Sequence, residues 1–254
     1  MTVLVVIPTF NEASNIETVV SRVMTQPIDG LHMLVVDDSS PDGTAEIVRR
    51  LQTRHANLHL IVREGTRGLG RAYVRGFEFA LKQGFDLIFE MDADGSHNPD
   101  DLPRFLELMD RYDLVIGSRY VEGGGISDWP MGRMLLSRGA NLYARAVTTL
   151  PIHDCTSGFK CFRQAVLAAF DLPTISANGY AFQIEVHFLA HRCGFRISEI
   201  PIVFTDREEG SSKMNLRIMR EAVVMPWRLV WQRIAGRLPL TRHRPGEDGR
   251  SCTP

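Results

Sequence analysis

The stretch Leu-Ile-Phe-Glu-Met-Asp-Ala-Asp-Gly, residues 87–95, decides the fold of this chain. It begins as a short, mostly apolar run, which is typical of a buried strand, and it ends in two carboxylates, Asp92 and Asp94. Amphipathic helical segments alternate with this strand and with four similar runs. This alternation predicts an α/β fold with a mainly parallel central sheet and helices on both faces. The other runs are residues 3–7, 33–36, 58–62 and 114–116, and the helical segments are residues 15–24, 43–54, 70–83 and 100–109.

Polar residues follow four of the five predicted strands. Ligands of such sheets bind in the crevice beyond the carboxyl ends of the strands. We therefore expect the four polar ends to meet in one crevice. They are Pro-Thr-Phe-Asn-Glu at 8–12, Asp-Asp-Ser-Ser-Pro-Asp-Gly at 37–43, Asp-Ala-Asp at 92–94 and Gly-Ser-Arg-Tyr at 117–120.

Two carboxylates separated by one residue at a strand end can approach the same divalent cation. Hard oxygen ligands favour Mg²⁺ or Mn²⁺, which usually retain waters and bind substrate phosphates. The alternative is an ordinary turn with a solvated aspartate, or a helix N-cap. The position of Asp92 and Asp94 after a buried strand, together with a second acidic strand end, favours a metal site.

The first two strand ends suit a nucleotide. A carboxylate at Asp37 or Asp38 can accept hydrogen bonds from a base or a ribose, as acidic groups do at nucleotide-binding switch points. Pro8, Phe10 and Glu12 offer an apolar face for a base with a carboxylate beside it. The alternatives are helix caps for the two aspartates and an ordinary loop for residues 8–12.

Composition narrows the class of protein. The chain has 254 residues, 44% of them hydrophobic and 23% charged, and its net charge of −1 gives no reason to expect a nucleic-acid partner. The four cysteines form no CxxC pair, and we interpret them as packing residues in a reducing compartment. The N-terminus has no signal-peptide pattern, so we expect a cytoplasmic protein. No run reaches the roughly 18 to 20 apolar residues of a spanning helix, because arginines interrupt the best candidate, residues 223–240.

The second half of the chain is predicted to complete the same domain on the acceptor side. It contains a glycine loop at 123–125, a helix at 134–150, a second helix at 180–192 and a strand at 197–204. We predict a single domain over residues 1–240: a nucleotide side up to about 120, an acceptor side over 121–215 and an amphipathic helical segment over 216–240. Residues 241–254 are rich in Pro, Gly and charge, which favours a disordered tail.

An ordered series of motifs resembles the polyprenol or dolichol phosphate mannose synthases of the inverting family 2 glycosyltransferases. The likeness runs from about residue 2 to 230, and its acceptor-side motifs from Gly117 onward are the most specific. The resemblance implies the GT-A-type fold of nucleotide-diphospho-sugar transferases. Besides the polar strand ends, the matching pieces are Arg-Gly-Leu-Gly-Arg-Ala-Tyr at 67–73, Gly-Ser-His-Asn-Pro at 95–99, Ser-Arg-Gly-Ala-Asn at 137–141, Thr-Ser-Gly-Phe at 156–159 and Asp-Arg-Glu-Glu-Gly-Ser-Ser-Lys-Met at 206–214.

The resemblance also implies roles for individual residues. The guanosine of GDP-mannose would be held by Pro8, Phe10, Glu12, Val36 and Asp38. Asp92, Ala93 and Asp94 would bind the diphosphate through the metal, and Arg207 and Lys213 would reach the same phosphates. Ser96 stands where the family often has a metal-binding glutamine; because a hydroxyl is a weaker ligand, its contact with the metal would be direct or through water. Phe10 stands where tyrosine is common and keeps the stacking face.

The implied reaction moves mannose to a polyprenyl or dolichyl phosphate with inversion. A phosphate monoester, with a second pKa of about 6, needs no general base to attack. It needs a cationic cradle, for which we select Arg119 and Arg133, because guanidinium groups grip phosphate oxygens in pairs. Asp94 and these two arginines are the predicted catalytic residues.

The segment from Leu216 to Leu238 has an apolar helical face with tryptophan and with arginines largely elsewhere. It would rest on the cytoplasmic face of a membrane or dock on a membrane-embedded partner. The equally weighted alternative is packing on the protein core.

Two other functions remain open on the sequence. One is a family 2 transferase that uses UDP-glucose or a related donor, although the QxxRW motif and spanning helices of polymerising relatives are absent. The other is a non-catalytic subunit that binds a nucleotide sugar; the retained pairs Asp92/Asp94 and Arg207/Lys213 argue against it. A dinucleotide-binding dehydrogenase is a weak third alternative, because Gly-Leu-Gly at 68–70 does not directly follow a strand.

Overall fold

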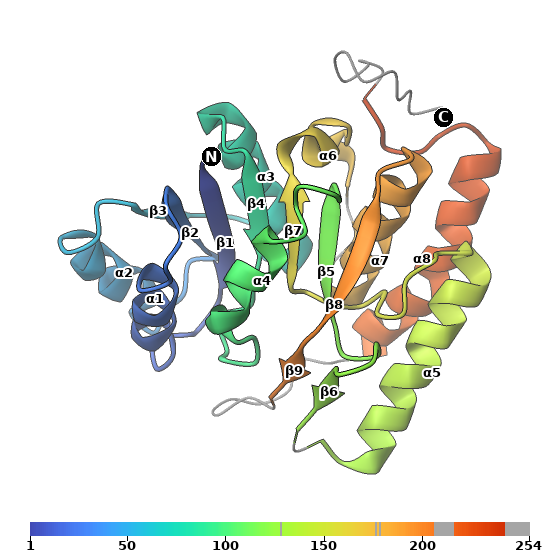
Figure 1. Cartoon of the computed structure of the whole chain (residues 1–254), viewed down its shortest axis with the longest axis horizontal. Helices are drawn as coiled ribbons and strands as arrows, with labels where there is room; N and C mark the ends of the chain where they lie inside the picture. Colours follow the sequence, from blue (N-terminus) through green and yellow to red (C-terminus); the bar gives the residue numbers. More distant parts are fainter. Residues whose placement is uncertain (128, 176, 178, 206–215, 242–254) are drawn as a thin grey trace.

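A seven-stranded sheet forms the centre of the computed structural model, which describes residues 1–127, 129–175, 177, 179–205 and 216–241 (Figure 1). The strand order is β3-β2-β1-β4-β7-β5-β8. The predicted mainly parallel sheet is confirmed, but β7 runs antiparallel to both of its neighbours, β4 and β5. The strands are β1 (Val3–Thr9), β2 (Leu31–Asp37), β3 (Leu58–Val62), β4 (Leu87–Glu90), β5 (Leu114–Ser118), β7 (Lys160–Arg163) and β8 (Ile197–Pro201).

The helices follow the predicted alternation through the first half of the chain. The segment at 100–109 forms only a short helix after a 3₁₀ turn at Pro99–Asp101, and the predicted strand at 197–204 divides into β8 and β9. Strand β9 (Val203–Phe204) pairs with β6 (Gly125–Ile126) as a separate small sheet. The helices are α1 (Ile16–Met24), α2 (Thr44–Gln52), α3 (Leu69–Gln83), α4 (Leu102–Leu106), α5 (Met131–Thr148), α6 (Gln164–Ala168), α7 (Gly179–Arg192) and α8 (Leu216–Ile234), with a second 3₁₀ turn at Leu172–Thr174.

Within the described ranges, none of the helices combines the length and the apolar character that crossing a membrane requires. The predicted tail falls outside the described residues, apart from Thr241.

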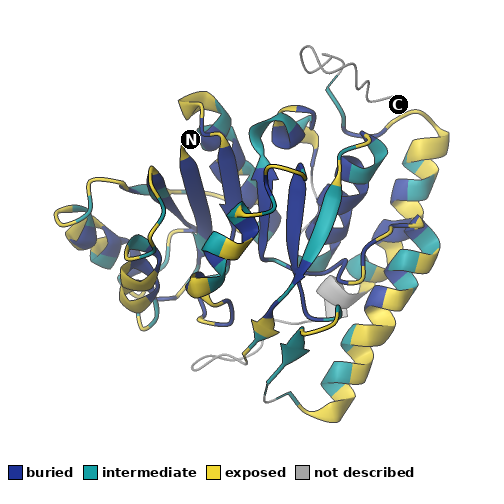
Figure 2. Cartoon of the chain, in the orientation of Figure 1, coloured by how far each residue is buried: buried dark blue, intermediate teal, exposed yellow. Residues whose placement is uncertain are grey.

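Each face of the sheet carries its own hydrophobic core. Leu4 and Val6 of β1 belong to one cluster, whereas Val3, Val5 and Ile7 belong to the other. Successive side chains of a strand point to opposite faces, so this fully buried strand divides its side chains between the two cores. Helices α3, α6 and α7 contribute to the first cluster, and α1, α2 and α4 contribute to the second. Burial is deepest in the central strands (Figure 2).

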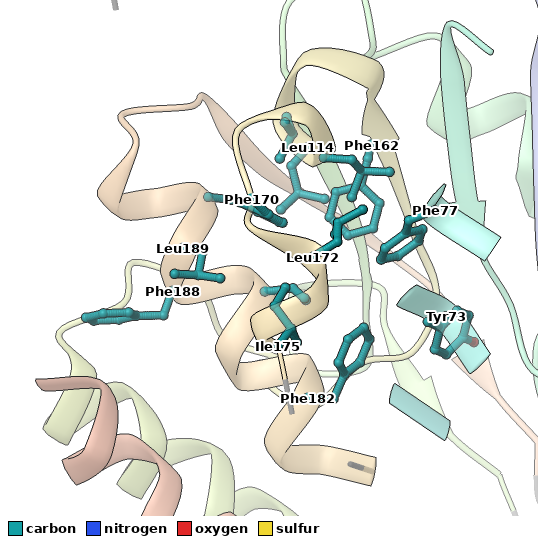
Figure 3. Packing of buried hydrophobic residues seen from close by; sticks show 14 of the residues in the cluster. Tyr73, Phe77, Leu114, Phe162, Phe170, Leu172, Ile175, Phe182, Phe188 and Leu189 are labelled. Atoms are coloured by element: carbon teal, nitrogen blue, oxygen red, sulfur yellow. The ribbon is translucent and has the colours of Figure 1, made fainter. Parts of the chain in front are cut away.

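Stacked aromatic rings join α3, β7 and α7 on the first face (Figure 3). The rings of Tyr73 and Phe182 are nearly parallel, with centroids 5.7 Å apart, and Phe77 meets Phe162 edge to face at 5.6 Å. Such pairs add to the stabilisation that burial alone provides. They fix the N-terminal ends of α3 and α7 beside the rim of the sheet, where the site described below lies.

Helix α3 approaches β1 closely at Gly76. A Cβ atom built at Gly76 would lie 2.3 Å from Cγ1 of Val6, a fully buried side chain. Real Cβ atoms do not come so close to a neighbour, so the helix can pack here only because residue 76 has no side chain.

We expect Gly76→Ala to lower the free energy of unfolding by about 1 to 3 kcal/mol, because the added methyl group forces α3 away from the sheet. Gly139→Ala is the matched control: Gly139 lies inside α5, and nothing stands within 4 Å of the place that a Cβ atom would occupy there. This control should gain about 0.5 to 1 kcal/mol from helix propensity. Urea unfolding followed by circular dichroism measures both variants, and equal stabilities would contradict the close approach.

Candidate active site

A cavity of about 850 Å³ opens beyond the carboxyl ends of β1, β2 and β4. The start of α3 forms one wall, and the starts of α5 and α7 together with α8 form the others. Three of the four polar strand ends therefore reach the same cavity. Its lining includes the predicted residues Pro8, Phe10, Glu12, Asp38, Asp92, Ala93, Asp94 and Arg133.

The loop after β4 presents both carboxylates at the cavity. The backbone N–H of Met91 still donates to the carbonyl of Val6, and the sheet ends there. Beyond it, the backbone N–H of Asp92 donates to Nδ1 of His97 (3.1 Å), and that of Ser96 donates to Oδ1 of Asp94 (3.1 Å). These two bonds close a tight turn, which holds the two carboxylates in place on a short loop.

Two neutral side chains, Tyr73 and His97, form hydrogen bonds with Asp92. The hydroxyl of Tyr73 donates to Oδ1 of Asp92 (3.2 Å), and burial, together with the charge of that carboxylate, raises the pKa of Tyr73 well above its usual value. Burial lowers the pKa of His97 to about 4, so its ring is neutral near pH 7. Both groups therefore position Asp92 without neutralising its charge.

Ser96 supports Asp94. Its side chain is 1% exposed, and its hydroxyl donates to the same Oδ1 atom that accepts from the Ser96 backbone. The Ser96 hydroxyl therefore helps to orient the Asp94 carboxylate.

The residues fit a divalent cation of the kind that binds nucleotide phosphates. Among the described residues there is no cluster of three or more His, Cys, Asp and Glu side chains able to hold a metal alone. Two carboxylates that line an open cavity, completed by waters and substrate phosphates, are what Mg²⁺ sites of this type use. Gly158 faces them: a Cβ there would lie 3.4 Å from Oδ2 of Asp92, so its absence leaves space beside that carboxylate.

The part of the cavity at β1 and β2 is apolar on one side and charged on the other. The guanidinium of Arg67 lies 4.1 Å from the centre of the Phe10 ring. Asp38 forms an ion pair with Arg63 and accepts from the backbone N–H of Gly68 (2.9 Å), so it holds the loop that carries Arg67. Asp37, by contrast, is fully buried and ties Thr9 to Ser40, which is a structural role.

Two other residues were predicted to bind the sugar donor: Glu12 lines the cavity, whereas Val36 lies in the hydrophobic core. Glu12 is 8% exposed, and its Oε2 accepts from the side chain of Asn15 (2.9 Å). Val36 lies inside β2 with its side chain fully buried in the hydrophobic core. Arg207 and Lys213 fall outside the described residues.

A smaller cavity of about 60 Å³ adjoins Asp92 and Asp94 on the side of β5 and α5, and both predicted acceptor arginines line it. The guanidinium of Arg133 lies 3.9 Å from the ring centre of Trp129. Arg133 also lines the large cavity, so it stands where the two spaces meet.

Arg119 has a buried carboxylate partner that the sequence did not indicate. Its Nε and Nη2 atoms donate to the two oxygens of Asp154 at 2.7 and 2.6 Å, and Nη2 also donates to the Thr156 hydroxyl. Burial disfavours the charged form of Arg119, but the charge of Asp154 outweighs this and raises the pKa of the guanidinium. Asp154 thereby fixes the orientation of Arg119 and offsets its charge.

Sequence reasoning missed several lining residues. The motif at 67–73 was recognised but given no role, although Arg67 and Arg71 both line the large cavity. Tyr180 and Gln183 of α7 also line it, as do five residues of α8, which no short motif marks. The α8 residues are Arg220, Glu221, Val224, Met225 and Arg228.

Comparison with known proteins agrees with this geometry. A family model described as glycosyl transferase family 2 matches residues 4–170. The chain belongs to this family, and it is a glycosyltransferase. It is 44% identical over 222 residues to the polyprenol monophosphomannose synthase of Mycolicibacterium smegmatis, which covers 87% of this chain and 83% of that protein. It is 42% identical over 244 residues to the undecaprenyl-phosphate mannosyltransferase of Micrococcus luteus, which covers 94% of this chain and 100% of that protein.

Solved structures confirm the expected GT-A-type fold of the glycosyltransferase. The mannosyl-3-phosphoglycerate synthase of Rubrobacter xylanophilus superposes with a TM-score of 0.65 at 19% identity, over 94% of this chain and 76% of that one. The glucosyl-3-phosphoglycerate synthase of Mycobacterium tuberculosis, in complex with Mn²⁺, UDP and glucosyl-3-phosphoglycerate, gives 0.62 at 17% identity, over 93% of this chain and 80% of that one. At these identities the likeness concerns the fold.

We expect Asp154→Ala to lower the free energy of unfolding by about 3 to 5 kcal/mol, because it leaves the buried Arg119 without its counter-charge. Thermal and urea unfolding measure this loss. Glu46→Ala, which breaks an exposed ion pair with Arg49, is the control and should change stability by less than about 1 kcal/mol. If Asp154→Ala were as stable as the control, the ion pair between Asp154 and Arg119 would contribute nothing to the stability of the fold.

Proposed function

We propose that this protein transfers mannose from GDP-mannose to a polyprenyl phosphate, such as dolichyl phosphate, with inversion at the anomeric carbon. The observation that carries the proposal is the shared lining of one cavity by Asp92, Asp94, Phe10 and Asp38, with Arg133 at its junction with the smaller cavity. The names of the two bacterial relatives, both of which act on a polyprenyl phosphate with mannose, support the same substrates.

The donor lies with its base near Phe10 and its diphosphate at Asp92 and Asp94. Phe10, Arg67, Asp38, Glu12 and Pro8 line that end of the cavity. The Arg67 guanidinium lies 4.1 Å from the centre of the Phe10 ring, so it must move aside for the base to stack on that face. A bound Mg²⁺ or Mn²⁺ would stabilise the negative charge that develops on the departing diphosphate. The arginines that line the same cavity add positive potential to this end of the reaction. Val36 supports this end of the cavity as part of β2, since its side chain is buried in the hydrophobic core. Arg207 and Lys213, which lie outside the described residues, are assigned to the donor phosphates.

The acceptor phosphate lies between Arg133 and Arg119, beside the two carboxylates. It attacks as a dianion, so the mechanism requires no proton transfer to a base. His97 is not suited to such a role, because it is buried, neutral and already accepts the Asp92 N–H through Nδ1. Asp154 holds Arg119 in a fixed orientation, and Arg133 stands where the two cavities meet.

The reaction takes place at the cytoplasmic face of a membrane, where a long polyprenyl chain must remain in the bilayer. The protein is held there peripherally, either by the lipid surface or by a membrane-embedded partner. Exposed tryptophans on α8 support this location, because tryptophan favours the interface between lipid and water.

Asp94→Ala should reduce mannose transfer at least about a hundredfold, because one of the two carboxylate ligands is lost while the fold stays intact. The assay is incubation of labelled GDP-mannose, Mg²⁺ and polyprenyl phosphate, followed by extraction of the lipid product. Asp110→Ala, at an exposed aspartate in the turn after α4, is the control and should retain full activity. Unchanged turnover in Asp94→Ala, or equal use of UDP-glucose by the wild type, would contradict the proposal.

Arg133→Ala should raise the KM for polyprenyl phosphate by about tenfold to a hundredfold, which corresponds to loss of a hydrogen bond to a charged group. The Kd for GDP, measured by calorimetry in the presence of Mn²⁺, should change by less than about twofold. The reverse result, weakened GDP binding with an unchanged KM for the acceptor, would assign Arg133 to the donor instead.

A further inference from the structure

Helices α5 and α8 share most of the exposed apolar surface of the molecule. Among the described residues, twelve large hydrophobic side chains are exposed, and nine of them belong to these two helices. Trp227 is 61% exposed, Trp231 is 59% exposed and Ile234 is 80% exposed. We call this surface the α5–α8 face. It consists of Met131, Leu135, Leu136 and Leu142 of α5 and of Val223, Val224, Trp227, Trp231 and Ile234 of α8.

The exposed residues form continuous stripes. Val223, Trp227, Trp231 and Ile234 recur at intervals of three or four residues, which places them on one side of α8. The other side of α8 packs on the protein through Met225 and Leu229, which belong to the hydrophobic core. The exposed stripe on α8 is therefore not needed for packing within the fold. Packing on the protein core, one of the two alternatives for this segment, accounts for only one side of the helix.

The two helices lie side by side at one edge of the molecule, at the right in Figure 1. The Tyr143 hydroxyl of α5 donates to the carbonyl of Val223 in α8 (2.7 Å), which links the two stripes. On α5, Met131, Leu135 and Leu142 also follow a helical spacing, with Arg138 between them. Long exposed segments of α5 are visible in Figure 2. The result is one broad face rather than isolated apolar residues.

Charge separates the two helices that carry this face from the rest of the chain. The sequences of α5 and α8 contain seven arginines and one glutamate, a formal charge of +6. The whole chain carries −1, so the remaining residues carry −7. A surface that combines tryptophan, aliphatic side chains and arginines fits the interface of a bilayer with anionic headgroups.

The α5–α8 face is continuous with the large cavity. Val224 is 55% exposed on the face and also lines the cavity. Arg133 at the start of α5 lines the cavity as well, as do Arg220 and Arg228 of α8. A lipid whose chain stays in a bilayer against this face could therefore present its phosphate to the cavity over a short path.

We propose that the α5–α8 face docks directly on a bilayer that contains anionic lipids, so that the acceptor enters the cavity from the membrane along this face. The inference rests on the proposed function for the identity of the acceptor. A second copy of the chain is a poorer occupant, because a two-fold interface would bring two arginine-rich helix pairs against each other, and like charges repel. An anionic lipid surface instead complements the charge.

The test is flotation of the full-length protein with vesicles of phosphatidylcholine, either alone or with about a third of phosphatidylglycerol, an anionic fraction at which each basic residue contributes measurably. We expect strong binding to the anionic vesicles and weak binding to the neutral ones. The double variant Trp227→Ser/Trp231→Ser should bind at least about tenfold less tightly, because it removes two interfacial anchors. Val62→Ser, at an exposed apolar residue of β3 on the opposite edge, is the control and should bind as the wild type does.

A second pair of variants tests the charge. Arg138→Gln and Arg233→Gln should each weaken binding to the anionic vesicles about fivefold. Arg75→Gln, at an exposed arginine of α3, should leave it unchanged. Two results would each overturn the inference. One is equal flotation of the tryptophan variant and the wild type, and the other is a wild-type protein that does not bind protein-free vesicles. The second result would point to a membrane-embedded partner or, if the protein is a dimer that Ile234→Asp dissociates, to self-association.

Activity with a short, water-soluble isoprenyl phosphate separates this inference from the proposed function. The tryptophan variant should retain wild-type turnover with that soluble acceptor and lose most of its turnover with the long-chain acceptor in anionic vesicles. Loss with both acceptors would overturn the inference, because the residues would then act in the chemistry. A wild type that is inactive with both acceptors but still floats would contradict the proposed function alone.

Discussion

The arrangement of the site depends on the proximity of two like charges, Asp92 and Asp94, at the rim of the central sheet. Two carboxylates so close together repel each other, and a divalent cation offsets that repulsion. The protein holds them in place with neutral groups: the phenol of Tyr73, the serine hydroxyl at Ser96 and the backbone turn closed by His97. These hydrogen bonds orient the two carboxylates at the cavity, where a metal and its phosphate ligands would bind.

The antiparallel strand β7 supplies the support beneath this pair. Lys160 of β7 lies opposite Glu90 in the strand register, with Nζ 3.3 Å from the carboxylate, and both side chains are fully buried. Burial lowers the pKa of the lysine and raises that of Glu90 to about 7. The lysine also donates to Gln183 of α7. This buried contact links β4, β7 and α7 directly behind Asp92, so the strand end that carries the carboxylates is fixed from both sides.

Much of the nucleotide side could be predicted from the sequence, because its signals are local. Buried apolar runs ended in carboxylates, and strands β1 to β5 and the Asp92/Asp94 pair follow from that pattern. The rest depends on contacts between distant residues. Asp154 and Arg119 form an ion pair although they are 35 residues apart in the sequence. Strand β7 enters the sheet between two strands, β4 and β5, that precede it in the sequence. The exposure of α5 was also missed, since its apolar residues follow a helical spacing that is equally typical of a buried helix.

The central claim is that Asp92 and Asp94 hold a divalent ion against the diphosphate of the donor. Crystals grown with Mn²⁺ and GDP test it most directly, through the anomalous scattering of manganese. The account predicts one strong anomalous peak within coordination distance of carboxylate oxygens of Asp92 and Asp94 and of a phosphate oxygen of GDP, with the guanine near Phe10. A nucleotide bound elsewhere, or manganese held away from both aspartates, would contradict it.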